Sequence, residues 1–257
     1  MFGSAASPRN LLLASLPCED LLYLQPRLER VPLFQGEVIV AQHEPIASVC
    51  FPEAGVTSLA DVLPDGTRVE VALIGREGMT NSQLLLGCAE APHEASVSIG
   101  GGTALRLPAE ELGELCARSP AARALFLRFI HALAVQASNT LACNIHYPVE
   151  KRLARWLLMF HDRSEGEEIA LLHSQLGRML SVRRATVTDA LHVLEGHRAI
   201  RSTRGRILVR DRSRLEELAG CSYGLAESLY RRIITPFGKD IEARMAPSVF
   251  VEQRSYG

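Results

Sequence analysis

The fold of this chain is decided by residues 171–210, which read LLHSQLGRMLSVRRATVTDALHVLEGHRAIRSTRGRILVR. A first short helix is predicted at the start of this stretch because apolar residues recur there at helical spacing. These residues are Leu176, Met179 and Leu180. Gly177 lies on the same stripe and leaves room for a second helix to pack closely. Ser181 stands at the expected turn, where small residues are favoured.

A second helix is expected from about Arg183 to Glu195, with Gly196 as its C-cap. Its apolar stripe consists of Val187, Ala190, Leu191 and Leu194. Its opposite face carries Arg183, Arg184, Thr186, Thr188 and Asp189. Beyond it, residues 200–203 and 206–210 read as two short strands joined at Arg204-Gly205, where glycine supplies the positive φ of a hairpin turn. This order is that of a winged helix-turn-helix, a motif that docks into the major groove of duplex DNA.

Two amphipathic helices and a hairpin also occur in domains that never touch nucleic acid, so the charge distribution has to support the interpretation. Residues 148–222 carry 14 Lys and Arg against 10 Asp and Glu, whereas residues 1–147 carry 9 against 15. Of those 14 cations, 13 are arginine, which forks onto guanine more selectively than lysine does. Basic charge concentrated in one domain predicts phosphate binding.

The bulk properties exclude several other classes of protein. At 257 residues the chain is long enough for two domains. No apolar run reaches 18 residues and the N-terminus lacks the charged start of a signal peptide, so we expect a cytoplasmic protein without a membrane span. The six cysteines form no CxxC pair, which argues against a metal site. G-x-S-x-G, P-loop and HExxH motifs are missing, so we do not expect an enzyme such as a hydrolase or transferase.

The front half of the chain has a different pattern from the basic C-terminal part. From Val31 to about Leu107, short β-type runs such as EVIVAQ, SVCFPEAG and RVEVALIG are separated by turns that include PDG at 64–66. We therefore expect an α+β protein with an N-terminal antiparallel, jelly-roll-like β-roll, a long central helix and the C-terminal winged helix-turn-helix.

The long central helix is predicted over residues 120–145, with Ser119 as N-cap and Pro120 at its first position. Its most regular stripe consists of Phe126, Phe129, Leu133, Gln136 and Thr140. That stripe packs either on its own domain or against the same helix of a second copy. Because 25 uninterrupted residues exceed a typical globular helix, we favour a homodimer interface.

Tyr147-Pro148 ends this helix, since a residue before proline is pushed out of the helical region. Five segments follow from these boundaries: a leader and helix over 1–30, a β-roll sensor over 31–118, a dimerisation helix over 119–147, a DNA-binding domain over 148–222 and a tail over 223–257. The tail starts as a helix, GLAESLYRRII, for which packing on the DNA-binding domain is the one role we can suggest.

With a β-roll, a long central helix and a winged helix-turn-helix in this order, the chain resembles the Crp/Fnr family of bacterial transcription regulators from about residue 31 to 220. The most specific likeness is SVRRATVTDALHVLE with RGRILV after it, and ACNIHYPVEKRLARWLLMFHDR is similar to the family's hinge and first DNA-domain helix. IGREGM at 74–79 resembles the glycine-rich turn of the family's β-roll. The resemblance implies a homodimer that places one recognition helix per DNA half-site, with RNA polymerase as a further partner.

The DNA-contact residues are carried over from the resemblance one by one. Arg184 takes the position of the family arginine that reads guanine, and Thr186 that of a threonine on phosphate. Ala185 stands where many members have a cytosine-reading glutamate, and Asp189 replaces a frequent arginine. The full expected DNA-contact set is Arg183, Arg184, Thr186, Thr188, Asp189, Arg204 and Arg206. Because of these two replacements, we expect a DNA half-site unlike those of the best-known members.

The sensor site departs further from the family pattern. An effector pocket is expected around Arg76, Glu77, Gly78, His93 and Glu94. The arginine that holds the phosphate of cyclic AMP in the family is missing, so a buried phosphate would lose its charge-assisted partner. The N-terminal cysteine cluster of the iron–sulfur branch is missing as well. We therefore expect no cofactor, and neither cyclic AMP nor an iron–sulfur cluster.

The sequence thus predicts a sequence-specific DNA-binding transcription regulator whose activity is set by an unidentified signal at the β-roll. Two alternatives stay open: a regulator of the same shape that needs no effector, and a degenerate member that acts as a protein-interaction module.

Overall fold

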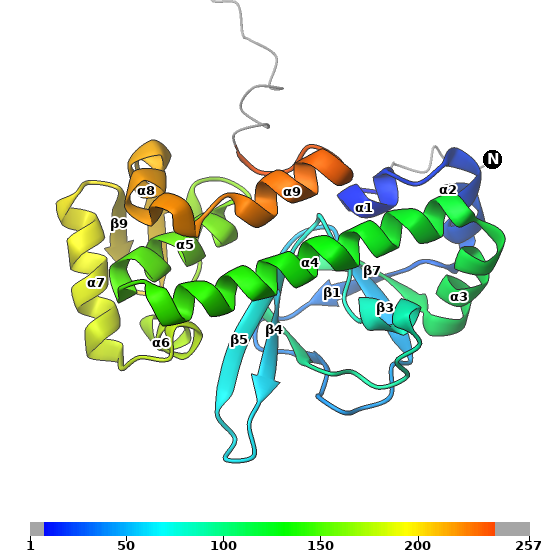
Figure 1. Ribbon diagram of the computed structural model, residues 1–257, viewed down its shortest axis with the longest axis horizontal. Coiled ribbons are helices and arrows are strands. Elements are labelled where there is room, and N and C mark those ends of the chain that lie inside the picture. Colours follow the sequence, from blue (N-terminus) through cyan, green and yellow to red (C-terminus); the bar gives the residue numbers. More distant parts are fainter. Residues whose placement is uncertain (1–7, 240–257) are drawn as a thin grey trace, which may run out of the picture.

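The computed structural model describes residues 8–239, in which a β-roll and a smaller, mainly helical domain are joined by one long helix (Figure 1). The helices are α1 (Leu11–Ala14), α2 (Cys18–Leu24), α3 (Ala109–Arg118), α4 (Pro120–His146), α5 (Val149–His161), α6 (His173–Leu180), α7 (Arg184–Gly196), α8 (Arg212–Ala219) and α9 (Leu225–Ile233). The strands are β1 (Glu29–Leu33), β2 (Val38–Val40), β3 (Ser48–Pro52), β4 (Val56–Val62), β5 (Arg68–Ile74), β6 (Glu94–Ile99), β7 (Gly102–Pro108), β8 (Glu168–Ile169), β9 (Ile200–Thr203) and β10 (Arg206–Val209). The predicted fold class is confirmed.

The β-roll consists of two antiparallel sheets with the strand orders β1-β7-β3 and β2-β6-β4-β5. Its main hairpin, β4-β5, turns at residues 64–66 as the PDG motif predicts, and Gly66 there has a φ of 80°. The N-terminal segment is less helical than expected, because Pro17 separates α1 from α2 and β1 already begins at Glu29. The predicted leader falls partly on residues 1–7, which lie outside the described part of the chain.

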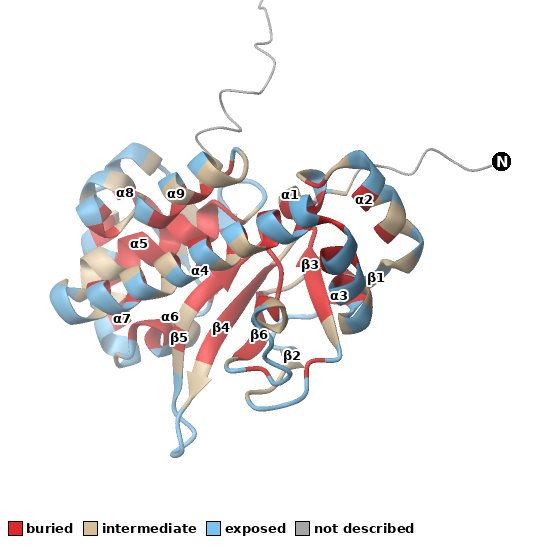
Figure 2. Cartoon of the chain, turned by 45° about the vertical axis from the view of Figure 1, so that its right-hand side comes forward, coloured by how far each residue is buried: buried red, intermediate tan, exposed pale blue. Residues whose placement is uncertain are grey.

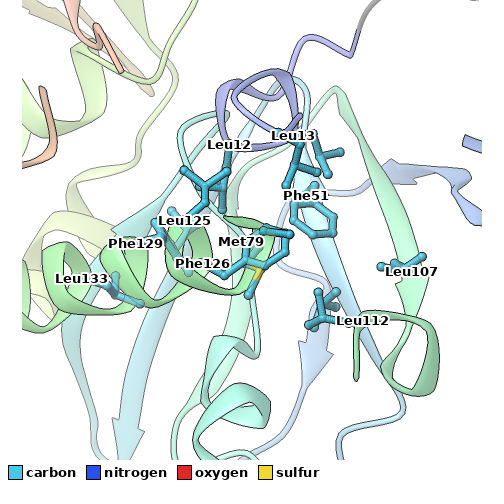
Figure 3. Packing of buried hydrophobic residues seen from close by; sticks show 14 of the residues in the cluster. Leu12, Leu13, Phe51, Met79, Leu107, Leu112, Leu125, Phe126, Phe129 and Leu133 are labelled. Carbon is cyan, nitrogen blue, oxygen red and sulfur yellow. The ribbon is translucent and has the colours of Figure 1, made fainter. Parts of the chain in front are cut away.

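The core of the β-roll is closed by helices from both ends of its sequence. Leu12 and Leu13 of α1, Phe51 of β3 and Phe126 of α4 meet in one buried cluster (Figure 3). The rings of Phe51 and Phe126 have their centroids 6.2 Å apart, which is within the range of favourable aromatic pairs. The long helix α4 is therefore part of the core of the β-roll along its first half.

Helix α4 begins as predicted, because the Ser119 hydroxyl accepts a hydrogen bond from the backbone N–H of Ala122 at 3.1 Å and Pro120 follows at the first position. It runs for 27 residues and ends at Tyr147, before Pro148. Figure 2 shows its buried residues on the side that lies against the strands.

The stripe that we assigned to a dimer interface is turned inward. All five of its residues, Phe126, Phe129, Leu133, Gln136 and Thr140, are buried within the chain itself. Gln136 pairs with the backbone of Leu73 through both amide atoms, accepting from its N–H at 2.6 Å and donating to its carbonyl at 3.2 Å. The assignment of these five residues to a dimer interface is therefore wrong, because β5 and the C-terminal elements already cover them.

The second domain has its own core around the single tryptophan. Trp156 of α5 is 1% exposed and packs with residues from α6, α7, the hairpin β9-β10 and α8. This cluster also takes in Val56 and Leu73 of the β-roll, so the two domains share apolar contacts. The short strand β8 pairs antiparallel with β10.

The described part of the tail folds back over the molecule. Helix α9 lies along α4, on the side away from the β-roll strands (Figure 1). The Tyr230 hydroxyl donates to the carbonyl of Glu77 at 2.6 Å, and the Asn139 amide of α4 donates to the carbonyl of Ser222 at 3.1 Å. The predicted helix at GLAESLYRRII is confirmed. Residues 240–257 lie outside the described range.

Two glycine substitutions test how tightly α4 sits on the sensor. A Cβ at Gly78 would lie 2.4 Å from the ring of Phe129, so Gly78→Ala should lower the free energy of unfolding by about 1–3 kcal/mol through overpacking. A Cβ at Gly113, inside α3, would meet nothing within 4 Å, so Gly113→Ala should raise it by up to about 1 kcal/mol. Urea unfolding measures both; effects of the same sign would contradict the packing described.

Candidate nucleic-acid interface

The turn of the helix-turn-helix is closed by two backbone features. Ser181 adopts the left-handed conformation with a φ of 53° and ends α6, while the N–H of Val182 donates to the carbonyl of Gly177 at 2.9 Å. A Cβ at Gly177 would lie 3.0 Å from the Val182 carbonyl oxygen. The close approach inferred from Gly177 is confirmed, and it fixes the angle at which α7 leaves α6.

Helix α7 is held by its buried stripe and exposes the face predicted to meet DNA. Val187, Ala190, Leu191 and Leu194 are buried, and Arg183, Arg184, Thr186 and Asp189 are exposed. Thr188 is half-buried, and its hydroxyl lies 3.2 Å from the carbonyl of Arg184 and 3.3 Å from Nδ1 of His173. Helix α7 includes Gly196 instead of ending before it, and the positive φ past the helix belongs to Arg198, at 59°.

The wing is the hairpin β9-β10, with Arg204-Gly205 between the paired residues Thr203 and Arg206. Gly205 has a φ of 77°, as the turn prediction requires. Both wing arginines are exposed, and Arg206 forms an ion pair with Glu168 of β8 at 3.1 Å. The wing thus presents one arginine at its tip and one along its edge.

A cleft of about 500 Å³ lies between the start of α6, the outer face of α7 and the wing. Its lining includes His173, Arg184, Thr188 and Ser202. The His173 ring bridges the two walls, with Nδ1 3.3 Å from the Thr188 hydroxyl and Nε2 3.3 Å from the Ser202 hydroxyl. Burial and the nearby Arg184 lower the pKa of His173, which keeps the ring neutral at pH 7.

His173 and Glu195 are functional-site residues that the sequence analysis missed. The Glu195 carboxylate accepts from the backbone N–H of Ser202 at 2.6 Å and so ties the wing to the end of α7. His173 is the first residue of α6 and faces the cleft only because α6 and α7 cross where they do. A polar residue at a helix start gives no signal of such a bridge in the sequence.

The residues predicted to form an effector pocket are not brought together. Arg76, Glu77 and Gly78 follow the end of β5, which pairs with Thr57 of β4. Glu94 pairs with Ala60, three residues further along β4, or about 10 Å at the rise of a strand. His93 bonds Asp61 at 2.7 Å instead, and Glu94 forms an ion pair with Arg68. The structure therefore does not bring these five residues together at one point, and their role in binding an effector stays a prediction.

Glu77 is instead joined to the DNA-side domain. Its buried carboxylate accepts from Nε of Arg163 at 2.8 Å and from the backbone N–H of Gly75 at 3.1 Å. Arg163, just past α5, also donates to the carbonyl of Met159 at 2.8 Å and lies over the ring of Phe237. Burial alone would lower the pKa of Arg163, but the carboxylates of Glu77 and other nearby acids raise it. The glycine-rich turn of the β-roll is thus occupied by the chain's own arginine.

Further polar contacts fix the helix-turn-helix against the β-roll. The Gln175 amide of α6 donates to the carbonyl of Ser98 on β6 at 3.4 Å. The guanidinium of Arg155, on α5, donates to the Thr140 hydroxyl of α4 at 3.0 Å. Helix α7 makes neither contact, so its outer face stays open. Helix α6, in contrast, is bound to the β-roll through Gln175.

Comparison with known proteins bears on this arrangement. Residues 151–218 match the family of the Crp-like helix-turn-helix domain. No curated protein matches the sequence. No described helix is both long and apolar enough to cross a membrane. Within residues 8–239, no three His, Cys, Asp or Glu side chains are grouped in a way that would hold a metal ion.

Several solved structures share the fold over most of their length. FixK2 from Bradyrhizobium japonicum has a TM-score of 0.66 at 19% identity, over 75% of this chain and 98% of that protein. A CRP-family transcriptional regulator from Thermus thermophilus has a TM-score of 0.61 at 19% identity, over 75% and 96%. The c-di-GMP-responsive regulator CLP from Xanthomonas campestris has a TM-score of 0.61 at 10% identity, over 75% and 99%. The chain therefore has the Crp/Fnr fold.

The buried pair between the domains gives a stability prediction. Arg163→Met should lower the free energy of unfolding by about 3–5 kcal/mol, because it leaves the buried Glu77 carboxylate without its partner. Arg106→Met removes an exposed ion pair with Glu29 and should cost less than about 1 kcal/mol. The double variant E77L/R163M should recover most of the loss. Chemical denaturation measures all three, and equal losses for the two single variants would refute the special role of the buried pair.

Proposed function

Because residues 151–218 form a Crp-like helix-turn-helix domain on the Crp/Fnr fold, we propose that the protein is a sequence-specific, DNA-binding transcription regulator. The observation that carries this proposal is the open face of α7. Arg183, Arg184 and Thr186 are exposed at its N-terminal end, beside the wing arginines and away from the docked face of α6. Recognition helices contact base edges with such N-terminal residues.

In this proposal the residues divide into two kinds of contact. Arg184 reads a guanine through its forked guanidinium, a contact that discriminates by about 1–3 kcal/mol. Arg183, Thr186, Arg204 and Arg206 lie where phosphates would run and set the register of the protein. Ala185 offers no hydrogen bond, and Asp189 can accept from a cytosine amine or pair with an arginine. The half-site therefore differs from those of the best-known relatives.

Arg184→Ala tests the base-reading role. Because guanine readout is lost but phosphate contacts remain, affinity for a bound genomic fragment should fall about 5- to 150-fold, the equivalent of about 1–3 kcal/mol, with little change on random DNA. Arg214→Ala is the matched control, since Arg214 is an exposed arginine of the same domain that pairs with Glu217 on α8. Fluorescence anisotropy at fixed salt measures the affinities. Equal losses on specific and random DNA would reject base readout.

We further propose that the protein acts as a homodimer through the remaining open stripe of α4. Residues at alternating spacings of three and four run along it: Ala124, Leu127, His131, Ala134, Ser138, Leu141 and Ile145. Leu141 is 63% exposed and Ile145 79%, unusual for large apolar side chains on a helix. A seven-residue repeat that is small or apolar at every position except His131, on an uncovered face, fits a two-helix coiled coil. The other faces of α4 are filled by the β-roll and α9.

Leu141→Glu tests this interface. Placing a charge within the seam should shift the protein from dimer to monomer and weaken binding to DNA with two half-sites more than tenfold. Leu225→Glu is the control, because Leu225 is 60% exposed on α9, outside the stripe. Sedimentation velocity reports the assembly state. If the dimer persists in L141E, or if L225E disrupts it to the same extent, the dimer interface does not lie on this stripe of α4.

The proposed regulator does not use cyclic AMP. The acidic residue of the glycine-rich turn, Glu77, is engaged by Arg163 and by the N–H of Gly75, and the Phe129 ring lies against Gly78. A cyclic phosphate would also lack the arginine that neutralises it in the family. The expected absence of an iron–sulfur cluster, the action of an unidentified signal at the β-roll and contact with RNA polymerase stay predictions from the sequence.

A further inference from the structure

The thiol of Cys221 belongs to a cluster of reactive side chains on the side of the molecule where the long helix meets the DNA-side domain. It lies in the short turn η3 (Gly220–Ser222), directly after α8, and it is exposed. Its Sγ is 2.9 Å from the hydroxyl of Tyr147 and 3.9 Å from the ammonium of Lys151. Tyr147 is the C-cap of α4 and Lys151 lies in the first turn of α5, so three elements meet at this sulfur.

The lysine of this cluster is held beside the sulfur from two sides. Its ammonium lies 4.2 Å from the centroid of the Tyr147 ring, which is a cation–π contact. A Cβ at Gly220, where φ is 51°, would lie 3.2 Å from the same ammonium. Glycine at this position therefore lets the backbone of η3 pass close to Lys151, and the next residue, Cys221, comes within reach of the charge.

These contacts favour the thiolate form of Cys221. A thiolate is stabilised by a nearby cation, and it is the thiolate that acts as the nucleophile in cysteine chemistry. The hydrogen bond from Tyr147 and then the charge of Lys151 lower the pKa of Cys221 below the ordinary value of a thiol. The same hydrogen bond raises the pKa of Tyr147, so the phenol keeps its proton and is the donor.

A second cysteine lies on the same side of α4. Cys143 stands four residues before Tyr147, and side chains at this spacing are neighbours on a helix surface. Its Sγ is 3.7 Å from the carbonyl of Ser222, the residue after Cys221. Burial raises the pKa of Cys143, and the charge of Cys221 raises it further, which places the two sulfurs within electrostatic range of each other. An exposed thiolate near a second, protonated thiol is the arrangement of redox-sensing cysteines.

We propose that Cys221 and Cys143 form a peroxide-reactive pair, in which Cys221 attacks hydroperoxides and Cys143 then closes a disulfide with it. In the first step the Cys221 thiolate attacks the terminal oxygen of the hydroperoxide. The S–O bond forms, the O–O bond breaks, and the leaving alkoxide or hydroxide takes a proton from water. Sulfur is thereby oxidised by two electrons to a sulfenic acid, and the peroxide is reduced.

The second step joins α4 to η3. The thiol of Cys143 attacks the sulfur of Cys221, the S–S bond forms, the S–O bond breaks, and the hydroxide leaves with the thiol proton as water. The new bond spans the break between α4 and α5 at Tyr147-Pro148 and removes the thiolate that Lys151 contacts. It therefore changes how the DNA-side domain is tied to the long helix. Only the consequence for DNA affinity rests on the proposed function; the chemistry of the pair does not.

Reaction of the reduced full chain with hydrogen peroxide tests the pair without DNA. Peptide mapping by mass spectrometry should find an intramolecular bond between Cys143 and Cys221. A dimedone probe, which labels sulfenic acids, should mark Cys221 in C143S, because the second step is blocked there. C221S should form neither product. C88S is the matched control, because Cys88 is also exposed but follows β5 in the β-roll, and it should form the bond at the unmodified rate.

The pH profile of the first step tests the positioning role of Lys151. Tyr147 and Lys151 are the titratable groups that contact the sulfur of Cys221. In the C143S background, Lys151→Gln should slow dimedone-detected oxidation about threefold at pH 7, because less thiolate is present. The rates should converge at alkaline pH, where both proteins hold the thiolate, and Lys151→Arg should restore the rate at pH 7. A loss that is the same at every pH would overturn the role of Lys151.

The outcomes separate this proposal from that of DNA binding. An unchanged reaction in C221S, or a disulfide between two copies of the chain in place of the intramolecular one, would overturn the pair whether or not the protein binds DNA. A lasting sulfenic acid on Cys221 without a bond to Cys143 would overturn the role of Cys143. Peroxide should then change DNA affinity in the unmodified protein, reversibly with a thiol reductant, and leave C221S unchanged; equal effects in both would overturn the regulatory consequence alone.

Discussion

The ion pair between Glu77 and Arg163 is the constraint on which the relative placement of the two domains depends. Its partners are 86 residues apart in sequence, and both are buried. Removing two charges from water costs several kcal/mol for each, so the pair persists only because its remaining polar atoms are also bonded, to Gly75 and Met159. An apolar contact would tolerate sliding, whereas this pair forms in one geometry. It therefore specifies the docked arrangement as well as stabilising it.

The long helix α4 shows how one element can serve three neighbours. Its first inward stripe closes the β-roll core through Phe126 and Phe129, and Gln136 continues that contact by bonding the backbone of Leu73. Its second face receives α9, through Asn139 among others. The third face remains open, and its large side chains, such as Ile145, are exposed. A helix with two covered faces can present only this last one to another copy.

Local pattern was enough to predict the helix-turn-helix, because Gly177, Ser181 and the stripe of α7 act within a few residues of one another. It was enough for α4 as well, since Ser119 caps its own helix. The assignment of the inward stripe of α4 to a dimer interface was wrong. Apolar residues lie on several sides of this helix, so the sequence does not reveal which side its own domain will cover. The five residues expected at the effector pocket do not converge, because the partner of Glu77 is Arg163, a distant residue that no periodicity points to.

Helix α6 links the two halves of the molecule in a way that neither half shows alone. Its first residue, His173, bridges α7 and the wing inside the DNA-facing cleft. Two residues later, Gln175 bonds the β-roll at Ser98, and Arg178 offsets part of the rise that burial causes in the pKa of Glu70 on β5. A shift of the β-roll surface therefore reaches the walls of the DNA cleft through two residues of one rigid turn. Helix α6 thus connects the surface of the β-roll to the walls of this cleft within one turn.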